Sequence, residues 1–97
     1  MKIYVKAKIT AIENEGTIKY KSDGKTSEVA TLILDVGDSD FICCNCFGRD
    51  RIAVCKEKMK AGVKAELVIN VLGKVRKSER LDKIMYDNDL SLKWILN

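Results

Sequence analysis

The feature that most constrains the fold is an alternation of apolar and polar residues, which recurs in five segments. In only one segment do the apolar residues follow helical spacing instead. Successive side chains of a β-strand point to opposite faces, so each alternating segment predicts a strand with one face in the core. The five predicted strands cover residues 3–12 (resuming at 17–20 after an interruption at Gly16), 26–36, 41–47, 63–72 and 84–96.

The single departure from this alternation is residues 49–60, which lack glycine and proline. Apolar residues there recur at helical spacing, as Ile52, Cys55 and Met59, and Gly62 is a natural stop for the helix. Residues 22–25 and 37–40 are predicted to be turns, and the polar segment 73–83 is predicted to be a loop.

The phase of the alternation predicts which side chains fill the core. Ile12 and Ile33 fall in the outward phase, and exposed β-branched residues there would suit a subunit interface. Trp94 is in phase with its leucine neighbours, so we expect it in the core or in a dimer interface. The residues expected to point inward are Ile3, Val5, Ala7, Ile9, Ala11, Ala30, Leu32, Leu34, Val36, Ile42, Cys44, Cys46, Val63, Ala65, Leu67, Ile69 and Val71.

The predicted order of elements is three strands, a helix and two strands, within one domain spanning residues 1–97. An all-β, five-stranded barrel with one helix between the third and fourth strands is the plan of the oligonucleotide/oligosaccharide-binding fold, the OB-fold. Ligands of that fold lie on the second and third strands, beside the first-to-second and fourth-to-fifth loops.

The predicted third strand has two faces of different character. One carries Ile42 and two cysteines, which suits a core, whereas the other places Asn45 between Phe41 and Phe47, the only phenylalanines of the chain. A face of this kind is a poor core row but a good platform for flat ligands. Nucleobases are flat, and stacking on an aromatic ring is worth roughly 1–3 kcal/mol per base.

The distribution of charge also favours a polyanionic ligand. The net charge is only +4, but residues 49–83 hold eleven basic and five acidic side chains. A concentrated positive surface attracts nucleic acids, although solvated lysine-rich faces are common too.

Other classes of function have little support. Four cysteines without histidine make a poor zinc site, since Cys43 and Cys46 would point to opposite faces of a strand, and thiols as core fillers are the simpler interpretation. We expect no metal and no cofactor. The sequence also has no phosphate loop, no nucleophile elbow and no acidic cluster at metal spacing, so we expect no enzymatic activity.

The setting expected from the sequence is cytoplasmic. No apolar run is long enough for a membrane span, the first residues lack a signal-peptide stretch, and the cysteine usage suits a reducing compartment. We therefore expect no membrane contact, and association with the nucleoid if the protein binds DNA.

In the order of its motifs the chain resembles the bacterial single-stranded DNA-binding protein family. The resemblance covers most of residues 1–72 and consists of the glycine-lysine turn at 23–25, the strands at 29–36 and 41–48, Arg49 opening the helix, and Lys60-Ala-Gly62. It implies base stacking by Phe41 and Phe47 and a basic contact by Arg49. Ile69 stands where the family commonly has glycine, the second-to-third and 73–83 loops lack aromatic residues, and the family's glycine-rich extension with its acidic tip is missing. We therefore expect a stripped-down relative, either phage- or plasmid-borne or a primosomal protein, without that tip's recruiting activity.

The leading hypothesis is a non-catalytic protein that binds single-stranded DNA with little sequence preference, in replication, recombination or repair. RNA remains an open alternative, and we expect a homodimer or homotetramer. The competing hypothesis is a protein-interaction module on the same barrel, such as a replication or primosome accessory. The candidate nucleic-acid-binding residues are Phe41 and Phe47 for stacking, Tyr4 beside Lys6 and Lys8 on the first strand, Arg49, and the basic cluster Lys74, Arg76, Lys77 and Arg80.

Overall fold

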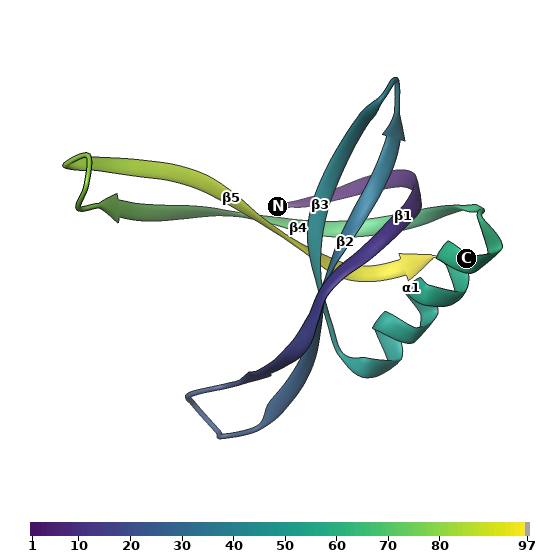
Figure 1. The fold of residues 1–97 in the computed structure, drawn as a ribbon, viewed down its shortest axis with the longest axis horizontal. Helices are drawn as coiled ribbons and strands as arrows, with labels where there is room; N and C mark the ends of the chain where they lie inside the picture. Colours follow the sequence, from purple (N-terminus) through teal and green to yellow (C-terminus); the bar gives the residue numbers. More distant parts are fainter. Residues whose placement is uncertain (97) are drawn as a thin grey trace.

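A computed structural model describes residues 1–96, which form five strands and one helix arranged as a closed barrel. The order of strands around the barrel is β1-β2-β3-β5-β4, and the helix lies between the third and fourth strands of the chain (Figure 1). The prediction of an all-β OB-fold barrel is therefore confirmed. The elements are β1 Lys2–Lys19, β2 Thr26–Gly37, β3 Asp40–Phe47, α1 Arg49–Ala61, β4 Lys64–Ser78 and β5 Lys83–Leu96.

Strand β1 is shared by the two sides of the barrel. Residues 2–8 pair with β4 and residues 8–19 pair with β2, so the strand passes from one neighbour to the other near Lys8. Irregularities in register between Ile9 and Ala11, and between Glu13 and Gly16, accompany this passage. Bulges of this kind bend a strand and shift its phase. Ile12, expected to face outward, consequently packs against the core.

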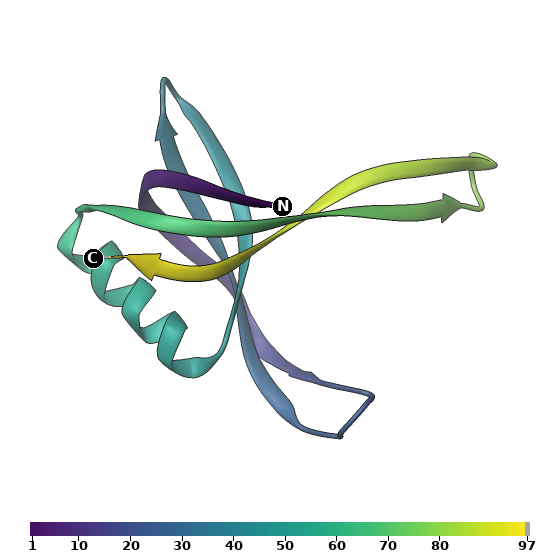
Figure 2. The same ribbon diagram turned by 180° about the vertical axis from the view of Figure 1, so that it is seen from behind.

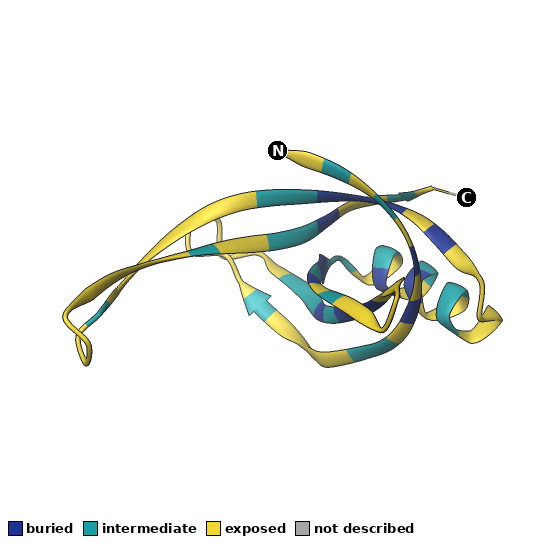
Figure 3. Cartoon of the chain, turned by 90° about the horizontal axis from the view of Figure 1, so that it is seen from above, coloured by how far each residue is buried: buried dark blue, intermediate teal, exposed yellow. Residues whose placement is uncertain are grey.

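The core lies between the barrel walls and the helix, as the dark segments of Figure 3 show. Cys44 and Cys46 are buried on the inner face of β3, as predicted, and α1 contributes Ile52 and Cys55. The helix ends as predicted at Gly62, whose left-handed backbone lets its N–H donate to the carbonyls of the last turn. No helix in residues 1–96 is long and apolar enough to cross a membrane.

Strands β4 and β5 extend well past the barrel as a two-stranded arm, residues 72–89 (Figures 1 and 2). The prediction that 73–83 is a loop is wrong, because paired residues continue to Ser78 opposite Lys83 and leave only 79–82 as the turn. β-prone side chains oppose one another along the arm, as in the pair of Val75 and Tyr86. The apolar side chains of the arm are exposed throughout.

The phase of β5 also differs from the expected one. Val68 pairs with Trp94 and Ile69 pairs with Leu92, so Lys93 is an extra residue on β5. Beyond this bulge Ile95 takes the inward position, and Trp94 is 40% exposed instead of filling the core. Val36 and Val63 were also expected inside, but both lie at the ends of paired segments and are exposed.

Candidate nucleic-acid interface

The outer face of β3 presents the predicted platform. Phe41, Cys43, Asn45 and Phe47 alternate with the buried residues of this strand, and they pair with the outward residues of β2. Phe41 is 65% exposed, whereas Phe47 is half-buried. Phe47 lies six positions after Phe41, which is about 20 Å along a strand at about 3.3 Å per residue. The rings therefore mark two ends of a face and do not form a single clamp.

The Phe41 end of this face is basic. Phe41 pairs with Asp35 of β2, and Asp35 pairs in turn with Lys8 of β1, which forms one row across three strands. Beside this row is a hollow of about 200 Å³, lined by Asp35 and three lysines. The Asp35 carboxylate accepts a hydrogen bond of 2.9 Å from the backbone N–H of Gly37. The lining residues of this lysine hollow are Lys6, Lys8, Asp35, Val36, Gly37 and Lys64.

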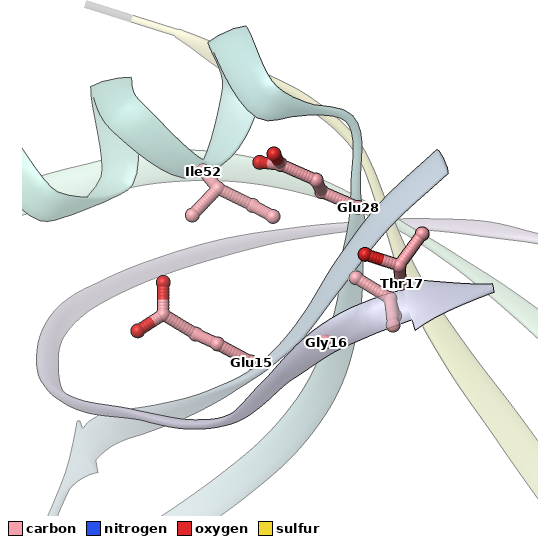
Figure 4. A pocket seen from close by; sticks show the side chains of 6 residues that line it. Glu15, Gly16, Thr17, Glu28 and Ile52 are labelled. Atoms are coloured by element: carbon pink, nitrogen blue, oxygen red, sulfur yellow. The ribbon is translucent and has the colours of Figure 1, made fainter. Parts of the chain in front are cut away.

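The Phe47 end carries two ion-paired carboxylates by contrast. A hollow of about 350 Å³ lies between α1 and the bend of β1, and Glu15, Glu28 and Ile52 are among the residues that line it (Figure 4). Glu15 is paired with Lys56, and Glu28 accepts a hydrogen bond of 3.1 Å from Nε of Arg49. Because each carboxylate is already paired with a cation, this hollow offers a phosphate little net attraction. Arg49 is largely exposed, and an exposed pair of this kind is weak, so its guanidinium can still reach an anion outside.

The structure separates the three candidates on β1. Lys8 lies in the row of Phe41, and Lys6 lines the same hollow. Tyr4 is 77% exposed and lies farther along β1, where the strand pairs only with β4. It therefore belongs to the outer face of β1, β4 and β5 and not to the β2–β3 platform.

The basic cluster of the arm is divided between two faces. Lys74 and Arg76 alternate with Val75 and point to one side, Lys77 points to the other, and Arg80 lies in the turn. Arg76 forms an ion pair with Asp87, with a nitrogen–oxygen distance of 2.6 Å, and across residues 72–89 the arm holds five basic and four acidic side chains. The positive surface expected here is therefore mostly balanced by the opposite strand.

The base of the arm, however, borders the platform. A hollow of about 130 Å³ lies between Cys43 and Asn45 of β3 and Asn88, Asp89 and Leu90 of β5. The polar groups nearest the platform are thus an amide and a carboxylate, while the basic residues lie farther out.

The four cysteines differ in accessibility. Only Cys43, which lies between the two phenylalanines, is exposed. Burial and the neighbouring thiols of Cys46 and Cys43 raise the pKa of Cys44 to about 12. A hydrogen bond with Cys46 and burial raise the pKa of Cys55. Within residues 1–96 no group of histidine, cysteine, aspartate or glutamate side chains is placed to hold a metal ion.

Lys64 is a residue of this surface that the sequence interpretation missed. It pairs with Lys8, so the fourth strand adds a cation to a row assigned to the first three. The pairing of first and fourth strands in a closed five-stranded barrel was the available signal, together with the outward phase of Lys64.

Comparisons with protein-family models, with curated proteins and with solved structures found no match.

Proposed function

We propose that this protein is a non-catalytic, single-stranded DNA-binding protein that stacks bases on the outer face of β3. The observation that carries the proposal is Phe41, a 65% exposed ring on the ligand-binding face of an OB-fold barrel, in one row with Lys8. An apolar ring that stays exposed to solvent contributes little to the stability of the fold, but it offers an unpaired base a stacking surface.

The proposed ligand is single-stranded because stacking on a protein ring needs a base that is not already stacked in a duplex. Stacking tolerates any base, and the face between the phenylalanines carries only small or polar groups such as Cys43 and Asn45. We therefore propose little sequence preference. RNA is the alternative ligand, and the same test includes it.

The charged candidates have unequal roles in this proposal. Lys6 and Lys8 contact phosphates beside Phe41, and Arg49 contacts a phosphate beside Phe47. The arm contributes through Lys74, Lys77 and Arg80, which no acidic side chain of residues 1–96 holds in an ion pair, and less through Arg76 because of Asp87.

The test is a fluorescence-anisotropy titration with a labelled thirty-base oligothymidine at several salt concentrations. We expect saturable binding that duplex DNA does not displace, with log affinity falling linearly as log salt rises. The same titration with oligouridine measures the preference between DNA and RNA. Absence of binding at low salt contradicts the proposal, and a slope near zero contradicts the phosphate contacts.

A second candidate function rests on the arm. Val75, Ile84 and Tyr86 share the face of the arm that continues the barrel interior, and all three are exposed. A two-stranded ribbon is marginally stable alone, so a covering partner would stabilise it. A second copy of the chain would fit a homodimer or homotetramer, and another protein would fit an interaction module. Sedimentation velocity of wild type and of a Tyr86→Ser variant separates a self-associating chain from a monomer.

A further inference from the structure

The outer face of β1, β4 and β5 carries a row of three apolar side chains that the platform does not use. Tyr4, Val68 and Trp94 are paired across the three strands. Val68 alternates with the inward residues Leu67 and Ile69 and lies outside the core cluster, yet it is fully buried. The neighbouring outer-face side chains must cover it, while Tyr4 and Trp94 remain 77% and 40% exposed.

Two lysines lie beside this row, together with the carboxylate of Glu66, which is opposite Lys6. The Lys2 ammonium lies 5.2 Å from the centre of the Trp94 ring, and Lys6 follows Tyr4 on the same face of β1. A hollow of about 370 Å³ next to Tyr4 is lined by Lys6, Glu66 and Leu96, among others. An exposed tyrosine with lysines on either side is complementary to a base flanked by phosphates.

The lysine hollow joins this face to the platform. Lys6 lines both hollows, and Lys8 is in the row of Phe41. Within residues 1–96 none of Lys6, Lys8 and Lys64 is held in an ion pair, so three free ammonium groups surround the one carboxylate of Asp35. This is the most favourable place on the platform margin for a phosphate to cross.

The opposite direction offers less attraction. Beyond Phe47 a strand would meet Glu15 and Glu28, each paired with a cation, and beside Asn45 it would meet Glu13, which shares a row with Thr31. A backbone with one charge per nucleotide therefore gains less there than at the lysine hollow.

We infer that bound single-stranded nucleic acid leaves the platform at Phe41, crosses the lysine hollow, and stacks a base on Tyr4 beside Trp94. This inference rests on the proposed function and deepens it, because it assigns the β1–β4–β5 face as a second stacking site with Lys2, Lys64 and Trp94 as new contacts. A strand on this path covers two faces of the barrel.

Trp94 is the only tryptophan of the chain, so its fluorescence reports on the path directly. Oligothymidine of thirty bases should quench Trp94 in parallel with the rise in anisotropy. A dinucleotide, whose two adjacent bases cannot occupy rings that lie two strands and four residues apart, should bind weakly and leave the emission unchanged when it occupies the Phe41 end. Inorganic polyphosphate, which has charge but no base, should compete for the lysines without quenching by stacking.

Two variants and a control test the crossing. Lys64→Glu should abolish most of the quenching and weaken binding of the long oligonucleotide roughly tenfold, because it reverses a cation in the hollow. Tyr4→Ala should weaken it by roughly 5- to 150-fold, the range expected for one stacked base. Lys21→Glu makes the same charge change in the turn before Thr26, at the opposite end of β2 from the hollow, and should retain the quenching. Lys64 and Tyr4 are exposed, so neither change should unfold the barrel.

The outcomes distinguish this inference from the proposed function on which it rests. Saturable binding with unchanged Trp94 emission overturns the inferred path to Tyr4 and Trp94 but agrees with binding on the platform. No binding at all overturns both. Emission that changes on dilution of the protein alone, and not on addition of oligonucleotide, overturns the inference and indicates that a second copy covers the row.

Discussion

Replacing Phe41 with alanine should separate binding from stability. About a third of this side chain is buried, and full burial of a phenylalanine is worth about 1.5–3 kcal/mol, so the folded state should lose roughly 0.5–1 kcal/mol. The affinity for single-stranded DNA should fall by about 1–3 kcal/mol, which is roughly 5- to 150-fold at 1.36 kcal/mol per factor of ten.

The variant should also leave the salt dependence unchanged. Phe41 carries no charge, so its removal displaces the plot of log affinity against log salt downward without changing the slope. Anisotropy titrations at three or more salt concentrations measure both quantities, and denaturant unfolding measures the stability. A changed slope would mean that the substitution moved a lysine of the row, such as Lys8.

Matched variants isolate the aromatic contribution. Phe41→Tyr and Phe41→Trp keep a stacking ring and should bind within a few-fold of wild type, whereas Phe41→Leu keeps apolar volume but should bind as weakly as alanine. Tyr20→Ala removes an exposed aromatic side chain that follows β1, at the opposite end of β2 from Phe41, and should not affect binding. The stacking argument fails if Phe41→Leu binds like wild type, or if Phe41→Ala weakens binding less than twofold.

Three further predictions concern thiols and the arm. Iodoacetamide should modify one thiol of the native protein, that of Cys43, and oligothymidine should slow this reaction, as mass spectrometry would show; unprotected Cys43 in a saturated complex contradicts binding across the platform. Replacing residues 75–86 with Asn-Gly should leave a folded barrel, because none of them belongs to the core, and should lower the salt slope; an unchanged slope means that the arm touches no phosphate. Burial raises the pKa of Cys44 from 9.0 to about 12, so the stability it contributes is complete below pH 9 and is lost as the pH rises toward 12; Cys44→Ala should flatten this part of the pH profile in denaturant unfolding, and identical profiles would contradict the assignment.

The barrel could be predicted because its signals are local and repeated. Each strand keeps an apolar phase long enough to define an inner face, and the one helical stretch is bounded by Gly48 and Gly62. With five strands and this position of the helix, few closed arrangements remain.

The errors arose where a single residue shifts the phase. Lys93 is inserted between two paired positions and turns Trp94 outward, although the sequence alternates smoothly through this segment. Ile12 is displaced in the same way by the irregularity after Ile9. A bulge leaves no mark in an alternating pattern, because it depends on how two strands must bend to close the barrel.

The arm was misjudged for a different reason. Residues 73–83 look like a loop when taken alone, since they are rich in lysine and arginine. Their structure is set by the partner strand, where Asp87 opposes Lys74 and pairs with Arg76. The same pairing that makes the segment a strand also neutralises much of its charge. The prediction of a loop and the prediction of a strongly positive surface therefore failed for the same reason.

This neutralisation changes where binding energy can originate. With the arm nearly balanced and the carboxylates at the Phe47 end held in ion pairs, the platform cations of residues 1–96 that no ion pair holds gather near Phe41, at Lys6, Lys8 and Lys64. On the platform, stacking and free positive charge occur together at Phe41, so that end should capture a strand first, and the rest of the ligand must follow from it. A ligand held from one end can extend along the platform or across the lysine hollow, and the charges of the two routes favour the hollow. In this proposal the distribution of charge on the surface, more than the number of its aromatic rings, determines how much of the barrel the nucleic acid covers.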